Sequence, residues 1–562
     1  MSQREKSFVG WILTAVPPIT TIAVAPVVAL DPINPPKLLV ITVGGFVVLG
    51  LALMKINGQK FGDISLPYKL IGIFLIDLLL VLCFSGVNFF QEFFGAEGRL
   101  TGFVTYVAFS GLFLGGVIAA SSRVLGRVAI ALITAGFFSL AYGLIQSKGA
   151  DPANWVNSYS PVIGFLGNPN FQSAFIGLSG VMAMALALTN TLSKLVRGSM
   201  IIYPFACLFI IKESDSVQGF GVLIAGLITI VAISVYFSKF KKFLLIYFSV
   251  AGIATGAGIL GLLNLGPLKS VLYEPSVTYR GDYWHAGWNM LIHHPILGVG
   301  LDNYGDWYRR ERTIDATLRR GPDVVSTAAH NIYLDFGSNG GFPLLAIYLL
   351  IIVTVFRAAI KVLKRSKVLD PIFVGLFAVW ISYLLVSVIS INQLGVAVWG
   401  WVISGLIVGY EIVGRENLPP TTNVKKNLKP IHRIESPLSA GSFKQISALM
   451  LGLILGLAVG LPPLVGSINF KDALETQNSN AVQGSADTFP QRQSHLIIIM
   501  NTLNDNNFNA GALQVAQEAV LRFPDSYQAW KILSTLRSAS PEQIRQAKAQ
   551  MKRLDPHNPD LK

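Results

Sequence analysis

The chain has 562 residues, 52% of them hydrophobic and 13% charged, whereas soluble globular domains carry about 25% charged residues. Its formal net charge is +14, but most Lys and Arg residues lie in short loops between apolar runs, so the charge gives no support for a nucleic-acid partner. The two cysteines, Cys83 and Cys207, lie inside apolar runs, which excludes a disulfide framework and a cysteine-based metal site.

Long apolar runs recur along the chain, and runs of about 18 residues or more are typical of membrane-spanning helices. They lie near residues 9–30, 37–54, 69–89, 102–120, 127–146, 168–189, 199–211, 219–237, 243–263, 331–356, 370–390, 396–413 and 446–466. We interpret the first run as a span rather than a cleaved signal peptide, because its apolar core is long. The pattern predicts an all-α, polytopic membrane protein of about 12–13 transmembrane helices.

The distribution of Lys and Arg predicts how these spans are oriented, because positive residues gather in cytoplasmic loops. With a cytoplasmic N-terminus, the inward loops contain basic clusters such as 239–242, 357–367 and 425–433. The short outward loops contain isolated basic residues: Lys37, Arg99, Lys148 and Lys212. The long loop at residues 265–329 and the C-terminal tail are therefore expected on the extracytoplasmic side.

The chain after the last span is polar at first and then has a helical pattern. We predict a transmembrane domain at residues 1–466, a linker at 467–500 and a helical tail at 501–562. The similar segments Leu521–Asp525 and Arg553–Pro556 recur about 32 residues apart, close to the period of a tetratricopeptide repeat. A generic helical hairpin is the alternative. Because so few repeats seldom fold alone, the tail is expected to pack on the membrane domain or on a partner protein.

The long outward loop contains a segment with the pattern of an amphipathic helix. Bulky side chains recur there at helical spacing: Arg280, Trp284, Trp288 and Leu291. With Ser276 or Thr278 as the N-cap, Arg280 would lie in the first turn, where backbone N–H groups attract anions and a guanidinium can bind phosphate. The tryptophans would lie at the membrane interface. In the alternative interpretation, Arg280 contacts lipid headgroups or pairs with Asp282.

His330 lies directly before the span that follows this loop. A histidine at the N-terminus of an outward helix feels the positive end of the helix dipole, which disfavours its protonated form. A neutral imidazole in a cleft is what a general base requires. The alternative is that His330 has only a structural role at the start of the helix.

Two other features of the long loop are predicted to be structural. His293 and His294 are adjacent, but third and fourth ligands do not follow at the usual spacing, so we predict that the protein has no metal site. A charged stretch is expected to form a solvated surface on which opposite charges balance: Asp302, Asp306, Arg309, Arg310 and Arg312.

Two shorter outward loops also contain candidate residues. Arg99 lies at the outer membrane boundary, against the positive-inside trend, and is a candidate for function or for lipid contact. In the second loop, Asn170 is expected to cap the next span while Pro169 lies at the turn. Turn formation alone explains this second loop equally well.

These blocks resemble the O-antigen ligase and polymerase superfamily of bacterial membrane glycosyltransferases, over about residues 95 to 410. The matching blocks are Gly98-Arg99-x-x-Gly102, Gly167-Asn168-Pro169-Asn170-Phe171, Arg280-x-x-x-Trp284, Pro295-x-x-Gly298-x-Gly300, His330-Asn331-x-Tyr333 and Gly340-Gly341. The resemblance implies transfer of a glycan from an undecaprenyl-diphosphate carrier to an acceptor hydroxyl at the outer face of the plasma membrane. It further implies inversion at the anomeric carbon without a metal or other cofactor.

The resemblance also implies roles for individual residues. His330 would be the general base and Arg280 the diphosphate contact. The residues implied to bind substrate are Arg99, Asn168, Asn170, Gln218, Trp284 and Asn331. In one respect the sequence departs from the family, because Gln218 stands where many members have an arginine in a Ser-Arg-Gly motif. The implied partners are the lipid-linked donor, a glycan, lipid or protein acceptor, and membrane lipid. The helical tail, rather than the resemblance, suggests an envelope-assembly protein as a further partner.

Other functions are compatible with the same sequence. A polysaccharide polymerase of the superfamily would share these motifs. A transporter or flippase of lipid-linked sugars would be expected to carry ionisable residues within its spans, where this chain has few apart from Asp77 and Asp335. A scaffold for wall synthesis, without catalytic activity, is the third alternative.

Overall fold

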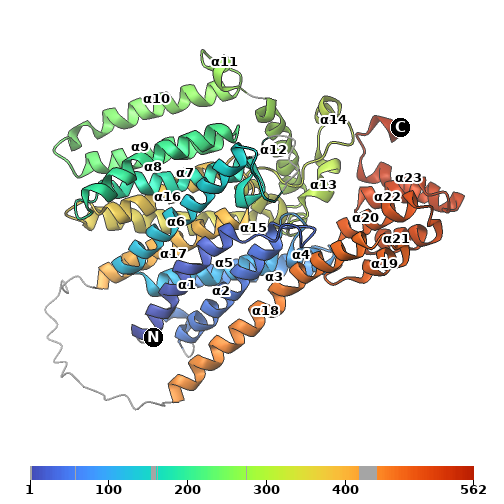
Figure 1. Cartoon of the computed structure of the whole chain (residues 1–562), viewed down its shortest axis with the longest axis horizontal. Coiled ribbons are helices and arrows are strands. Elements are labelled where there is room, and N and C mark those ends of the chain that lie inside the picture. Colours follow the sequence, from blue (N-terminus) through green and yellow to red (C-terminus); the bar gives the residue numbers. More distant parts are fainter. Residues whose placement is uncertain are drawn as a thin grey trace.

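The computed structural model describes residues 3–56, 59–153, 160, 162–273, 275–416 and 440–561, and these residues form helices and no strands. The predicted basic cluster at 425–433 lies outside the described residues. Figure 1 shows a bundle of long helices, with the helices of the C-terminal tail gathered at one of its ends. The all-α fold predicted from the sequence is confirmed.

Within the described residues, nine helices are long and apolar enough to cross a membrane. They are α2 (Asn34–Ile56), α3 (Leu66–Phe84), α6 (Ser122–Ser147), α8 (Lys194–Glu213), α9 (Gln218–Tyr236), α10 (Leu244–Leu262), α15 (Ile332–Arg365), α17 (Leu394–Glu416) and α18 (Ala440–Glu475). The helices α5 (Phe103–Ala119) and α16 (Pro371–Val386) are shorter and apolar. With α1 (Gln3–Ile22) and α7 (Pro169–Leu186), every predicted apolar run corresponds to a helix, which confirms a polytopic membrane protein.

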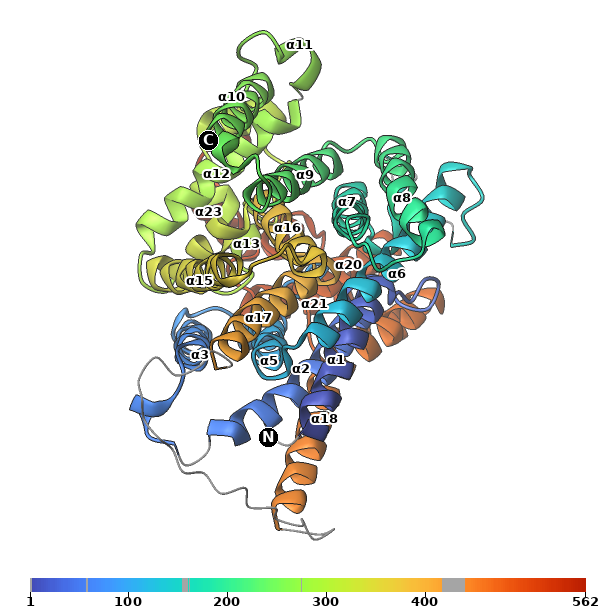
Figure 2. The same cartoon turned by 90° about the vertical axis from the view of Figure 1, so that its left-hand side faces the viewer.

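Small residues bring the central helices of the bundle into close contact. A Cβ added at Gly111 of α5 would lie 2.1 Å from the carbonyl oxygen of Gly45 of α2, and one at Gly405 of α17 would lie 2.0 Å from that of Phe113. Such close approach is typical of membrane helices, where packing replaces the hydrophobic effect as the driving force. Figure 2 shows α2, α5 and α17 next to one another, and α18 alongside α2.

Several further helices lie towards one end of this bundle. They are α4 (Phe89–Phe94), α11 (Lys269–Leu272), α12 (Pro275–His293), α13 (Tyr304–Glu311) and α14 (Ile314–Arg320). The segment between α10 and α15 and the tail lie at the same end of the bundle (Figure 1), and α13 contacts the tail directly. This common position agrees with the prediction that both are on one side of the membrane.

The tail has its own apolar core. It consists of α19 (Ser479–Gly484), α20 (Gln493–Asp505), α21 (Asn509–Arg522), α22 (Tyr527–Thr535) and α23 (Pro541–Leu554). Helix α20 packs on α21, and α22 packs on α23, around buried residues such as Leu496, Ala516 and Trp530. The segment 467–500, predicted as a linker, contains the end of α18, all of α19 and the start of α20. The assignment to tetratricopeptide repeats stays a prediction.

Candidate functional site

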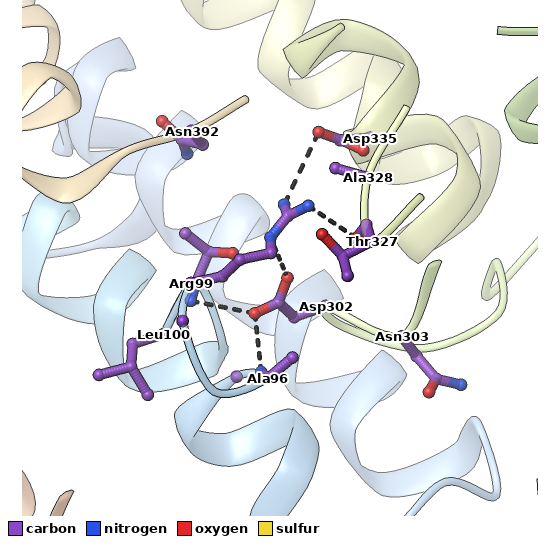
Figure 3. A network of polar contacts seen from close by, with 12 residues as sticks. Ala96, Arg99, Leu100, Asp302, Asn303, Thr327, Ala328, Asp335 and Asn392 are labelled. Atoms are coloured by element: carbon purple, nitrogen blue, oxygen red, sulfur yellow. Dashed lines mark hydrogen bonds and ion pairs between the residues drawn. The ribbon is translucent and has the colours of Figure 1, made fainter. Parts of the chain in front are cut away.

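Arg99 is the centre of a buried ionic network that joins three distant parts of the chain (Figure 3). Its Nε lies 2.8 Å from Asp302 Oδ1, its Nη2 lies 3.7 Å from Asp335 Oδ2, and its Nη1 donates a hydrogen bond of 2.8 Å to the carbonyl oxygen of Thr327. Only 7% of Arg99 is exposed. Burial alone would lower the pKa of Arg99, but Asp302 and Asp335 raise it above its ordinary value, so the guanidinium stays charged.

Asp302 ties this network to the loop that carries Arg99. Its Oδ2 accepts hydrogen bonds from the backbone N–H groups of Ala96, at 2.8 Å, and Thr101, at 3.2 Å. The loop is tight, since a Cβ added at Gly95 would lie 2.6 Å from the same carboxylate oxygen. Asp302 therefore fixes both the side chain of Arg99 and the backbone around it.

Asp335 fixes the segment that presents His330. Its Oδ1 accepts a hydrogen bond of 2.8 Å from the backbone N–H of Ala329. The N-cap of α15 is Asn331, whose side chain accepts a hydrogen bond of 3.1 Å from Leu334 N. His330 thus precedes the cap, with a left-handed backbone at φ 52°. A non-glycine residue seldom adopts this conformation unless the surrounding contacts determine it.

The imidazole of His330 lies where helix α12 meets the start of α15. The ring is half-buried, and its centroid is 5.4 Å from that of Tyr283 on α12. Burial, and then the positive charges of Arg280 and Arg99, lower the pKa of His330 from 6.5 to about 4. The lowered pKa agrees with the prediction of a neutral imidazole. The causes of this shift are burial and two guanidinium groups rather than the helix dipole.

Arg280 does not lie in the first turn of its helix, and this part of the prediction is wrong. Helix α12 begins at Pro275, upstream of both predicted caps, Ser276 and Thr278. Arg280 is therefore in the second turn, away from the exposed N–H groups at the helix start. Its Nη1 donates to the hydroxyl of Ser276 at 3.2 Å.

The other charged and aromatic side chains of α12 have separate surroundings. Asp282, an alternative partner for Arg280, forms an ion pair with Arg319 of α14. Arg320 of the same helix lies over the ring of Tyr279, at 4.2 Å from its centroid. Trp284 is half-buried, one turn after Arg280. Helix α14 therefore holds the outer side of α12 in place.

Two glycine blocks of the sequence form a single contact between α12 and α15. A Cβ at Gly298 would lie 2.4 Å from the backbone N of Gly340, and a Cβ at Gly341 would lie 2.6 Å from the carbonyl oxygen of Ile296. Both Gly298 and Gly341 have positive φ, which favours glycine. The loop after α12 thus fits into a kink of α15, and this contact sets Arg280 and His330 relative to each other.

The candidates near α7 and α9 lie in a polar contact between these helices. Asn168 caps α7 by accepting a hydrogen bond of 2.9 Å from Asn170 N, with Pro169 as the first helical residue. The capping role predicted for Asn170 therefore belongs to Asn168, because the helix begins two positions earlier. The side chain of Asn170 instead accepts a hydrogen bond of 2.8 Å from Ser216 Oγ. Gln218, the first residue of α9, is 3% exposed.

The start of α7 approaches the start of α15. A small cavity is lined by Phe171 of α7, Ile332 of α15 and Asn392 of the loop before α17. Asn392 is drawn near Arg99 in Figure 3 and donates a hydrogen bond of 3.2 Å to Tyr106 Oη. The α7 candidates are thus neighbours of the His330 segment, although no direct contact with His330 is seen among the described residues.

The charged stretch of the long loop is buried, and its prediction as a solvated surface is wrong. Arg309 and Arg312 are 4% and 1% exposed. Both form ion pairs with Asp555 of the tail, at 3.0 Å and 2.8 Å, while Arg310 pairs with Asp525. The tail supplies the compensating carboxylates, which the loop sequence alone does not contain.

Three residues of this site are absent from the sequence-based candidates. Asp302 is hidden among other charges, and Tyr283 gives no signal in a helix rich in aromatic residues. Asp335 does give a signal, because a carboxylate in an apolar span requires a partner. The presence of Asp335 in an apolar span would have supported the prediction of a buried arginine beside it.

Among the described residues, no group of three or more His, Cys, Asp or Glu side chains could hold a metal ion. Residues 180–349 match the family model described as O-antigen ligase. The matched range contains Gln218, Arg280 and His330, whereas Arg99 lies before it and the tail after it. Comparison with curated proteins gives no match. The matched segment holds α12 and the start of α15 inside an all-α membrane bundle, and the match supports the O-antigen ligase superfamily that the sequence motifs resemble.

Proposed function

We propose that the protein transfers an oligo- or polysaccharide from an undecaprenyl-diphosphate carrier to an acceptor hydroxyl at the outer face of the bacterial plasma membrane. The match of residues 180–349 to the O-antigen ligase model supports glycosyl transfer of the ligase type in general. The observation that carries the residue roles is the place of His330: its ring packs on Tyr283 of the helix that carries Arg280, and Arg99 holds the segment before it through Thr327 and Asp335.

In the proposed reaction, His330 accepts the proton of the acceptor hydroxyl as its oxygen attacks the anomeric carbon. The bond from that carbon to the diphosphate breaks on the opposite face, so the configuration inverts. The carrier leaves as undecaprenyl diphosphate, whose negative charge Arg280 stabilises through hydrogen bonds to phosphate oxygens. A positioned base contributes about 10²–10⁴-fold to the rate of such a step.

The low pKa of His330 suggests an order of events. At a pKa of about 4 the imidazole is neutral but a weak base. A bound diphosphate would place negative charge near Arg280 and so raise the pKa of His330 toward neutrality. His330 would then become an effective base only when the donor is bound. In the empty site it would be a weaker base and would activate water less.

Arg99 is proposed as a positioning residue rather than a phosphate contact. Two carboxylates and the carbonyl of Thr327 surround its guanidinium, and the side chain is almost fully buried. Through Thr327 and Asp335 it holds the segment before His330. Asn168 and Asn331 use their side-chain oxygens as helix caps, and Asn170 accepts a hydrogen bond from Ser216. We propose that these three residues also shape the site rather than bind substrate.

Trp284 and Gln218 are the remaining candidates for substrate contact. Trp284 lies on α12 one turn after Arg280 and offers an aromatic face of the kind on which sugar rings pack. Gln218 is buried and neutral, so the positive charge that other members carry at this position would come from Arg280. We propose that these two residues affect binding more than chemistry.

The test uses purified protein in lipid nanodiscs with an undecaprenyl-diphosphate glycan and an acceptor. Arg280→Ala and His330→Ala are each expected to lower carrier release by about 10²-fold or more. His285→Ala, which changes an exposed histidine on α12, and Arg545→Ala, which changes an exposed arginine of the tail, are the matched controls. Full turnover in both site variants would reject the assigned roles.

The products of the same assay separate the other functions. One transferred block per acceptor is expected of a ligase, and a ladder of lengths would indicate a polymerase instead. Movement of lipid-linked glycan across a vesicle membrane without a new glycosidic bond would indicate a transporter. Neither activity, with stable capture of a wall-synthesis protein, would indicate a scaffold.

A further inference from the structure

A cavity of about 240 Å³ lies between the tail and the membrane domain. Its walls come from three parts of the chain. Ala96 and Glu97 belong to the loop before α5, Thr327 to the long loop, and Arg492 and Tyr527 to the tail. The tail is therefore one wall of the cavity, and the cavity does not exist without it.

Two buried arginines that line this cavity have guanidinium nitrogens without a hydrogen-bond partner among the described residues. Arg492 is 9% exposed, and its Nη1 donates to the carbonyl oxygen of Gly95 at 3.0 Å, but its Nη2 has no hydrogen-bond partner in the described part of the chain. Arg309 is 4% exposed, pairs with Asp555 through Nη1, and likewise leaves its Nη2 without a described partner. Buried donors of this kind normally find an acceptor. Both residues line the cavity, so a group bound there can supply the missing acceptors after a small rotation of either guanidinium.

The rest of the lining favours a sugar over a simple anion. The side chain of Gln493 donates to Asp306 Oδ1 at 3.1 Å, so planar polar groups are already oriented in the wall. The guanidinium of Arg309 lies over the ring of Tyr527, at 4.1 Å from its centroid, which adds an aromatic face. Asp555 is shared between Arg309 and Arg312, but Glu97, Asp302 and Asp306 also line the cavity, so a phosphate would meet carboxylates as well as the two arginines. Hydroxyl groups satisfy such donors and acceptors without adding net charge.

The cavity adjoins the candidate catalytic centre. Thr327 and Asp302 line it and are also the groups that hold Arg99. Three residues after Thr327 comes His330. The volume is below the about 300–1,000 Å³ of sites for drug-sized ligands, so the cavity fits a short stretch of glycan rather than a whole chain.

We propose that this cavity binds sugar residues of the donor glycan beyond the reacting end, so that the C-terminal tail forms part of the substrate site. The proposal rests on the proposed function, because it takes Arg280 and His330 as the place where diphosphate and anomeric carbon lie. From that place the glycan of a lipid-linked donor must extend away from the membrane. The cavity and the tail lie beside the His330 segment at the same end of the bundle.

The test measures binding apart from turnover. The probe is the oligosaccharide pool released by mild acid from the undecaprenyl-diphosphate lipids of the producing cells. It is titrated against the full-length protein in nanodiscs, and binding is followed by saturation-transfer NMR. The released sugars carry no diphosphate and cannot react, so their binding reports on the saccharide site alone.

Two substitutions fill the cavity from opposite walls without removing a buried charge. Gln528→Trp acts from α22 and Val325→Trp from the long loop. Each is expected to raise the dissociation constant about tenfold or more, whereas Gln546→Trp, on the exposed surface of α23, is expected to leave it unchanged. Thermal unfolding of all three variants is the control, and each variant is expected to unfold like the wild type, with the tail still folded.

Two failures would have different meanings. If the wild type binds none of the pool, or if both cavity variants bind as tightly as the wild type, the saccharide site is rejected, whatever the transfer assay shows. If the wild type transfers no glycan but binds the pool with the expected sensitivity to Gln528→Trp, the proposed function is rejected and the saccharide site remains.

Discussion

Arg99 and Arg280 lie on different segments that close over the same end of the bundle, and both lower the pKa of His330. Arg99 is 7% exposed and paired with two carboxylates from distant parts of the chain. Arg280 is half-buried on α12 and donates to a serine hydroxyl of its own helix. In the proposed mechanism the first arginine holds the site together and the second contacts the substrate. Two residues with similar sequence signals thus differ in burial, and the roles proposed for them differ accordingly.

The largest expected effect concerns Arg99 and stability. Arg99→Ala would leave Asp302 and Asp335 buried without their cation, and breaking a buried pair in this way costs about 3–5 kcal/mol. We expect a much lower thermal unfolding temperature and poor expression. Adding Asp302→Asn removes one of the uncompensated charges and is expected to restore part of the stability.

This result would sharpen the distinction between the two arginines, because Arg280→Ala is expected to change turnover with little change in unfolding temperature. If Arg99→Ala unfolds like the wild type and loses only transfer, Arg99 contacts substrate and its proposed positioning role is wrong.

A smaller effect is expected in the pH dependence of transfer. In the free enzyme His330 has a pKa of about 4, so the acid limb of kcat/KM is expected near pH 4 rather than near 6.5. In the donor complex the diphosphate offsets positive charge and raises this pKa, so the acid limb of kcat is expected at higher pH. Initial rates of carrier release across this range measure both limbs.

The same profile separates the contributions to the histidine. Arg280→Gln removes a positive charge near His330. Because this removal favours the protonated imidazole, the pKa of His330 rises and the acid limb of the residual kcat/KM is expected to move to higher pH. Arg545→Gln, far from the site, is the control and is expected to leave the limb in place. An acid limb near 6.5 in the wild type would show that His330 is not the base that titrates.

The helices could be predicted from the sequence and most of the ion pairs could not, for one physical reason. Each span follows from the composition of a continuous run, because the bilayer requires about 20 apolar residues in sequence. The pairing of Arg99 with Asp302, or of Arg312 with Asp555, depends on segments that meet only in the folded chain. The charged stretch of α13 therefore resembles a solvated surface until the tail covers it.

The candidate site, like the fold, could be predicted only in part from the sequence. The position of His330 before a span and the helical spacing around Arg280 indicated a common outward region. Helix starts were less predictable, since Pro275 and Asn168 displaced the expected caps by a few residues. Asp335 could have been recognised by its place in an apolar run, whereas Asp302 could not be distinguished from its charged neighbours.

The smallest expected effect concerns Asn168. The same question applies to it as to the two arginines: whether the side chain builds the site or binds substrate. As the N-cap of α7 it accepts a hydrogen bond from Asn170 N, and loss of such a cap costs about 1 kcal/mol. Asn168→Ala is expected to lower stability by that amount, whereas Asn168→Ser retains an accepting oxygen and is expected to keep both stability and transfer. Thermal unfolding and carrier release measure the two properties. If Asn168→Ser is as stable as the wild type but transfers poorly, the amide itself contacts the substrate, and Asn168 belongs with Arg280 rather than with Arg99.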